Sequence, residues 1–112
     1  MSLEALWTMQ YRDAGGWQSG GVVVLETGRL FGGDSSFYFI GGYNMAGDKL
    51  TAKAAVEHYD GSNFSAFGVP LKSFSVEGEF TRKGNLMEGY FWQPGNPSLR
   101  LPILLTRRAD LP

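Results

Sequence analysis

The sequence predicts an all-β protein, an eight-stranded antiparallel up-and-down barrel. Apolar and polar residues alternate through most of the chain, which is the pattern of strands with one buried face. Short turn-forming segments such as "AGDK" and "TRKGN" separate the alternating runs, and such connections join antiparallel neighbours. Glycine occurs inside several runs, where the strands of a small barrel bend most sharply. A curled open sheet and a sandwich are the alternatives.

Eight runs carry the strand pattern. The expected strands cover residues 3–11, 17–26, 30–33, 36–43, 49–59, 71–80, 85–93 and 99–107. The first alternates around Trp7, and the second contains the β-branched stretch "VVV", which favours a strand. The short third run follows the second through the turn "ETGR", and the fourth is the aromatic run "FYFI".

The fifth run, within "DKLTAKAAVEHYDG", has two interpretations. A capping aspartate, good helix formers and a terminal glycine allow a helix, whereas a complete period-two apolar face favours a strand, which we prefer. The sixth, seventh and eighth runs show the same alternation in "FSVEGEF", "LMEGYFW" and "LRLPILLT". The serine-led stretch 62–68 is compatible with one helical turn before Pro70.

Length and composition are those of one domain over residues 1–112. Residues 1–3 are interpreted as an expression leader and residues 108–112 as a frayed tail. The chain has no cysteine, so it can form neither disulfides nor thiolate metal sites. It has a net charge of −1 and lacks a signal peptide and any apolar run of about 20 residues. We therefore expect a cytoplasmic protein that binds neither nucleic acid nor membranes directly.

The stretch "GRLFGGDSSFYFIGGY" invites a chemical interpretation. A phosphate loop would continue into a helix with a lysine and a hydroxyl in register, but a strand-like run follows here. A calcium loop would need several carboxylates at fixed spacings, and Asp34 stands alone. The sequence instead predicts a rigid corner between two strands, in which Asp34 accepts hydrogen bonds from main-chain amides two residues further on.

No combination of residues predicts catalysis. His58 is the only histidine, and no paired carboxylate accompanies it in the pattern that a recognisable acid–base site requires. We therefore expect no enzyme activity, no metal site and no cofactor. An enzyme would need at least two polar groups converging near His58.

The assembled motifs resemble the GrlR-type negative regulators of type III secretion. The similarity extends from about Leu6 to Arg107, and it includes "LW", a glycine doublet before "VVVL", "LTAKAAVEHY" and the "FG" at residues 67–68. Its most specific part is a core of nine residues: Gly28, Arg29, Gly32, Gly33, Asp34, Ser35, Tyr38, Gly41 and Tyr43.

This resemblance implies a lipocalin-like barrel that forms a homodimer and represses transcription by capturing a DNA-binding activator protein. In the founding member an acidic surface motif carries activator binding. The corresponding segment here is "NMAGDKLT", which makes Asn44, Asp48 and Lys49 the candidate partner loop. One aspartate and one lysine replace the acidic cluster, so the barrel can be shared while the partner differs.

A carrier of a small apolar ligand is the main alternative function, because an eight-stranded barrel can hold one such molecule. The candidate interior lining comprises Trp7, Met9, Phe39, Val56, His58, Met87 and Phe91. Apolar residues on the opposite faces of their strands would form a dimer face if they make one patch. These are Leu6, Tyr90, Trp92 and Leu104.

Overall fold

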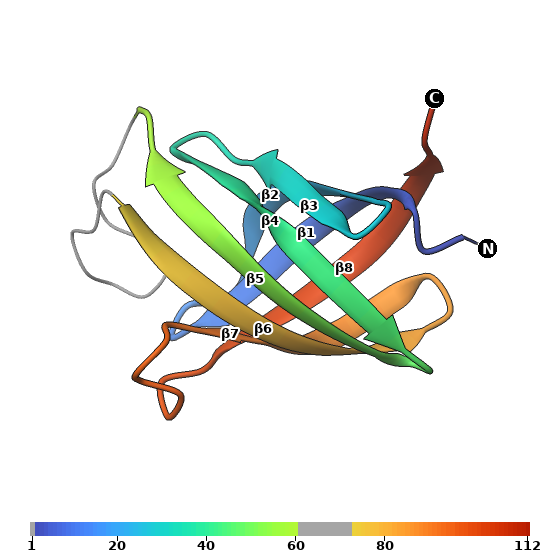
Figure 1. Ribbon diagram of the computed structural model, residues 1–112. Coiled ribbons are helices and arrows are strands. Elements are labelled where there is room, and N and C mark those ends of the chain that lie inside the picture. The colour runs from blue at the N-terminus through green and yellow to red at the C-terminus, as the bar shows by residue number, and fades with distance from the viewer. Residues whose placement is uncertain (1, 61–72) are drawn as a thin grey trace.

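Eight antiparallel strands close into one barrel in the computed structural model, which describes residues 2–60 and 73–112 (Figure 1). The strands are β1 (Ala5–Asp13), β2 (Gly16–Glu26), β3 (Arg29–Gly33), β4 (Phe37–Ala46), β5 (Lys49–His58), β6 (Ser73–Lys83), β7 (Leu86–Trp92) and β8 (Leu101–Asp110). Each strand pairs with its neighbours in the sequence, and β1 pairs with β8 to complete the circle. The prediction of an all-β up-and-down barrel is therefore confirmed.

The up-and-down order gives the barrel two unlike ends (Figure 1). The β1–β2, β3–β4 and β7–β8 connections lie at one end, which we call the cavity end. Both termini and the β2–β3, β4–β5 and β6–β7 turns lie at the other, which we call the terminal end. The described residues include no helix that is long and apolar enough to cross a membrane.

Strand β5 shows how the alternating pattern produces the wall. Its even-numbered residues from Leu50 to Val56 are buried, and its odd-numbered residues from Lys49 to Ala55 are exposed. A helix would have scattered these small apolar residues around its circumference, whereas a strand turns all of them towards one face. Burial of that face decides in favour of the strand, and the helical alternative for residues 49–59 is wrong.

Two inward-facing glycines let neighbouring strands approach closely. A Cβ atom on Gly41 would lie 1.9 Å from the carbonyl oxygen of Lys53 on β5, and one on Gly89 would lie 1.9 Å from the carbonyl oxygen of Glu79 on β6. Real side chains do not approach a backbone oxygen this closely. These positions therefore require glycine because the barrel coils tightly there.

The terminal end is packed solid around Trp7, which is completely buried on β1. Its indole Nε1 donates a hydrogen bond to the Leu3 carbonyl (2.9 Å), and the guanidinium of Arg82 lies over its ring at 5.8 Å. Arg107 pairs directly with Trp7 across β1 and β8; its side chain is 4% exposed, and its Nε donates to the Ser2 carbonyl. Two arginines thus cover this end of the core.

The last strand extends further than the sequence predicts. Strand β8 begins at Leu101 rather than at residue 99, and it continues to Asp110 because Ala109 and Asp110 pair with the start of β1. The assignment of residues 108–112 to a frayed tail is therefore wrong for 108–110. The possible helical turn at 62–68 and the expected start of the sixth strand at 71–72 lie outside the described residues.

Replacement of Gly41 by alanine should reduce the free energy of unfolding by about 3 kcal/mol or more, because the new methyl group would collide with the backbone of β5. Gly47→Ala is the matched control. Gly47 has a φ of +63° but nothing within 4 Å of an added Cβ, so only the left-handed conformation, about 1 kcal/mol, opposes alanine. Urea denaturation of both variants measures the difference, and equal losses would contradict the close approach at Gly41.

Candidate functional site

The β3–β4 corner is built around the carboxylate of Asp34. Its Oδ1 accepts hydrogen bonds from the amides of Ser36 and Phe37, both at 2.8 Å, and its own amide donates to the Phe37 carbonyl at 2.9 Å. The hydroxyl of Tyr59 donates to the Asp34 carbonyl. The predicted corner is confirmed, and its aspartate holds the backbone together.

The remaining motif residues extend this corner along β3 and β4. Gly28 follows Thr27 in the two-residue β2–β3 turn and has a φ of +80°, and its carbonyl accepts the amide of Tyr43 at 2.9 Å. Arg29 forms an exposed ion pair with Glu26, while the Tyr38 ring packs outside the barrel against Tyr59 at a centroid distance of 6.3 Å. Gly28 and Tyr43 thus join the β2–β3 turn to β4, while Arg29 and Tyr38 lie on the outside of the barrel.

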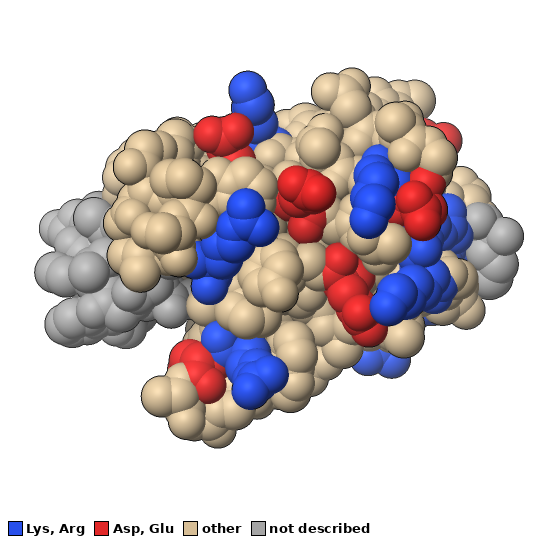
Figure 2. All heavy atoms as spheres, turned by 90° about the horizontal axis from the view of Figure 1, so that it is seen from below, with Lys and Arg blue, Asp and Glu red and all other residues tan. Residues whose placement is uncertain are grey.

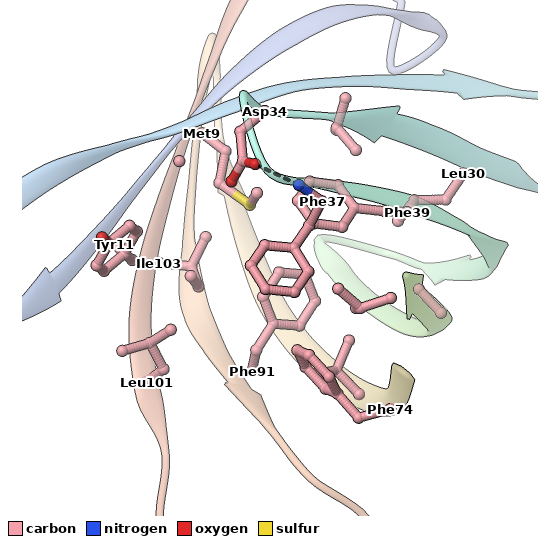
Figure 3. Close-up of a pocket in the computed structure, with 15 residues that line it drawn as sticks. Met9, Tyr11, Leu30, Asp34, Phe37, Phe39, Phe74, Phe91, Leu101 and Ile103 are labelled. Atoms are coloured by element: carbon pink, nitrogen blue, oxygen red, sulfur yellow. Dashed lines mark hydrogen bonds between the residues drawn. The ribbon is translucent and has the colours of Figure 1, made fainter. Parts of the chain in front are cut away.

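An apolar cavity lies inside the barrel on the side of this corner. Its volume is about 80 Å³. Figure 3 shows the rings of Phe37, Phe74 and Phe91 pointing into it, with Tyr11 and Leu101 on another side. The lining described is Met9, Tyr11, Gly20, Val23, Leu30, Asp34, Phe37, Phe39, Ala54, Val56, Phe74, Val76, Phe91, Leu101 and Ile103.

The structure divides the predicted interior lining into three groups. Those that line the cavity are Met9, Phe39, Val56 and Phe91. Trp7 and Met87 are fully buried but belong to the packed core outside the cavity lining. His58 lies at the end of β5 with its ring edge-on to Phe37, at a centroid distance of 5.3 Å. His58 is thus part of the aromatic packing at the cavity end.

Tyr11 is the lining residue whose titration is most affected by its surroundings. Partial burial raises the pKa of its phenol above the usual 10.0, and the negative charges of Asp13 and Asp34 raise it further. The sequence places Tyr11 on the inward face of β1, but only the fold brings Asp34 near it. The cavity therefore has aromatic walls and an electronegative edge.

The outer wall carries a continuous apolar row across five strands. Direct cross-strand pairs connect Leu6 to Val24, Val24 to Phe31, Phe31 to Ile40 and Ile40 to Ala55. Ile40 is 60% exposed and Phe31 is 39% exposed. We call these five residues the apolar row.

The other predicted dimer-face residues lie elsewhere on the barrel. Tyr90 and Trp92 are outward-facing residues of β7, and Leu104 lies on β8 opposite Glu88. The apolar row extends from β1 to β5, whereas Tyr90 and Trp92 lie on β7, which is separated from Leu6 on β1 by strand β8. Leu6 therefore does not share a patch with Tyr90 and Trp92.

The rings of Tyr90 and Trp92 contact the side chain of an arginine. The guanidinium of Arg100 lies over the Trp92 ring at 5.0 Å and over the Tyr90 ring at 5.7 Å. Beside them on β6, Glu77 pairs directly with Trp92 and Glu79 with Tyr90. Sequence analysis missed Arg100 because it precedes β8 in an eight-residue connection, and nothing in the local pattern links it to the aromatic residues of β7.

The candidate partner loop is smaller than the sequence predicts. Asn44 belongs to β4 and Lys49 to β5, so only Gly47 and Asp48 connect the two strands. Lys49 Nζ donates to Thr81 Oγ1 at 2.7 Å, and the Asp48 carbonyl accepts the amide of Arg82 at 2.8 Å. The expected loop over residues 44–51 is therefore wrong, because pairing between β4 and β5 continues to the tight turn.

Charges on the outer wall are mixed in sign. On the face shown in Figure 2, acidic and basic side chains lie interspersed rather than gathered by sign. Lys53 pairs across the sheet with Glu77, and Lys83 forms an ion pair with Glu88 at 3.1 Å. Within residues 2–60 and 73–112, no group of three or more histidine or acidic side chains is placed to hold a metal ion.

Comparison with protein-family models gives no match for this chain, and comparison with curated proteins gives none either.

Titration of Tyr11 should make the folded state less stable in alkali. Because its pKa is raised in the folded protein, the unfolded chain loses this proton at a lower pH. The contribution of the protonated Tyr11 phenol to the free energy of unfolding is complete below about pH 10. It is lost as the pH rises through the pKa that Tyr11 has in the folded protein. Tyr11→Phe should remove part of this alkaline loss.

The measurement is urea denaturation between pH 8 and pH 11. Tyr90→Phe, a change at an exposed tyrosine, is the control. If Tyr11→Phe and the unmodified protein lose stability in parallel up to pH 11, the raised pKa is contradicted.

Proposed function

We propose that this chain is a non-catalytic, cytoplasmic regulator of the GrlR-like type, a homodimer that represses transcription by binding an activator protein. The observation that carries this proposal is the apolar row on the outer wall. Five adjoining strands contribute one apolar residue each, and Ile40 and Phe31 at its centre remain exposed. Contiguous exposed apolar surface of this kind marks protein interaction sites.

The row supports homodimer formation because it is continuous. Its members are direct cross-strand neighbours, so two copies can place the same faces together around a twofold axis. Val22 and Tyr38, which lie on the same outward faces of β2 and β4, are also exposed and widen the apolar area. A second copy would remove this surface from water, which is the main favourable term in association.

The interior supports a role without catalysis. The lining of the cavity is almost entirely apolar, and the Oδ1 atom of Asp34 already accepts two backbone amides. A general acid or base needs a polar partner placed to exchange a proton with the substrate. The structural role of Asp34 favours a stable corner over proton transfer.

The outer charges support a protein partner rather than direct binding to DNA. Nucleic-acid binding depends on clustered lysine and arginine that neutralise phosphates. Lys53 and Lys83 instead lie beside Glu77 and Glu88, and the net charge of the chain is −1. This distribution agrees with repression through an activator protein.

A carrier of small apolar molecules is the second candidate, and the cavity favours it. Its volume of about 80 Å³ is about half of a cavity that accepts benzene, about 150 Å³. About three or four buried methylene groups at about 0.8 kcal/mol each correspond to millimolar affinity. The interior thus suits the end of an alkyl chain better than a whole lipid. Because the cavity is this small, we rank the carrier function below the regulatory function.

Ile40→Lys should disrupt the homodimer, because it places a charge at a position of the row that is 60% exposed in the single chain. Burying an unpaired ammonium costs several kcal/mol, so the dimer dissociation constant should rise by about 100-fold or more. Sedimentation equilibrium measures it. Thr51→Lys, on the exposed face of the neighbouring strand β5 but outside the row, is the control and should leave the dimer intact.

Affinity capture from the native cell extract tests partner binding, with identification of both proteins and small molecules. The proposal predicts enrichment of a DNA-binding activator by the unmodified chain. Recovery of a stoichiometric apolar compound with no protein partner would favour the carrier instead. An Ile40→Lys variant that remains dimeric would remove the row from the dimer interface.

A further inference from the structure

The outer wall at β6 and β7 carries a second surface of different chemistry. Tyr90 and Trp92 are alternate residues on the outward face of β7, and the Arg100 guanidinium lies over both rings. Aromatic faces attract cations through the negative potential above the ring. This contact shows that the pair accepts a guanidinium on its outer side.

Two carboxylates border the aromatic pair. Glu77 and Glu79 lie on β6 directly opposite Trp92 and Tyr90, which places their Cβ atoms about 5 Å from those of the aromatic residues. Among the described residues, the ion pairs found within 4 Å do not include either glutamate. Both carboxylates are therefore placed to pair with an incoming cation, and Lys53 beyond Glu77 is the one basic residue directly paired with them across the sheet.

A surface hollow adjoins these residues. It has a volume of about 490 Å³, and its lining includes Trp92, the carboxylates Glu77 and Glu79, the basic residue Lys53, and Thr51 and Gly42. Gly42 and Thr51 contribute little bulk, so the hollow is open above β4 and β5. Its size falls in the range of binding pockets, about 300–1,000 Å³. One aromatic wall, two carboxylates and one lysine border it.

We propose that Glu77, Glu79, Tyr90 and Trp92 form a recognition site for an arginine side chain of a protein partner, and that Arg100 occupies its aromatic half in the free chain. Arginine fits better than lysine, since its planar guanidinium can stack on a ring and bind a carboxylate with two parallel hydrogen bonds. An arginine from a partner displaces Arg100 from Trp92 and gains the two carboxylates. The inference rests on the proposed protein-binding function and specifies the chemistry of the partner.

The internal arginine gives this site a distinctive expected behaviour. Removal of Arg100 takes away a competitor and one positive charge, so Arg100→Gln should bind an external arginine more tightly than the unmodified chain. Loss of the Glu77 and Glu79 carboxylates, or of the Trp92 indole, should weaken the binding of external arginine. A surface that bound arginine only through general electrostatic attraction would respond equally to any nearby acidic residue.

The experiment is a titration of the full chain with N-acetyl-arginine amide, followed by the NMR signals of the Tyr90 and Trp92 rings. The lysine analogue and the uncharged citrulline analogue are matched probes. We expect the arginine probe to bind most tightly, the lysine analogue less tightly and the citrulline analogue least. The affinity for the arginine probe should be about three- to fivefold higher in Arg100→Gln than in the unmodified chain. The Glu77→Gln/Glu79→Gln double variant and Trp92→Leu should each weaken binding about threefold or more.

Glu88→Gln is the control variant. Glu88 lies on β7, the strand of Tyr90 and Trp92, but its carboxylate pairs with Lys83. This variant should therefore bind the arginine probe like the unmodified chain. All the variants are on the surface, and thermal unfolding verifies that each is folded. The inference is overturned if Arg100→Gln does not bind arginine, if citrulline binds equally well, or if the double variant behaves like Glu88→Gln.

Failure of this site is distinguishable from failure of the proposed function. If the unmodified chain captures a protein from its cell extract but the arginine titrations fail, the protein-binding function stands and the partner docks elsewhere. If arginine binds as expected but no protein is captured, the site stands as an arginine site and the regulatory proposal fails.

Discussion

The structure depends on closing eight strands around a very small interior. The pairing of β1 with β8 joins the two ends of the sheet, so each of the eight strands has a paired neighbour on both sides, and all inward residues must share one narrow space. Where the wall coils most tightly, as at Gly41 and Gly89, no side chain fits between the strands. Closure therefore determines which residues fill the core and which faces remain for recognition.

One consequence is that the two ends of the barrel have different roles. Trp7, Arg82 and Arg107 fill the terminal end, whereas a small cavity remains near the corner held by Asp34. The outer wall has an apolar row centred on β3 and an aromatic and acidic group of residues on β6 and β7.

Much of this was predictable from the sequence, because a period-two pattern determines which residues face inward. The alternation in β5 correctly indicates a buried row from Leu50 to Val56, and the Asp34 corner follows from the hydrogen-bonding habit of aspartate. Strand ends were less predictable. Pairing with β1 extends β8 to Asp110, and pairing between β4 and β5 reduces the expected partner loop to Gly47 and Asp48.

The grouping of surface residues was not predictable, because it depends on barrel geometry. Leu6 and Trp92 both face outward, but in a closed circle outward directions diverge, and the two residues contribute to different surfaces. Similarly, Arg107 and Arg108 look alike in sequence. Arg107 points inward and is buried, whereas Arg108 is exposed and donates to Thr8 Oγ1 at 2.9 Å, because neighbouring residues of a strand face opposite sides.

The central claim is that this barrel works through its outer wall by binding proteins. The most direct test is a native mass spectrum of the protein released gently from its own cells. The account predicts two copies of the chain, with a fraction that also carries a protein partner and without a stoichiometric small molecule. A single chain that retains one apolar molecule and no protein would contradict it.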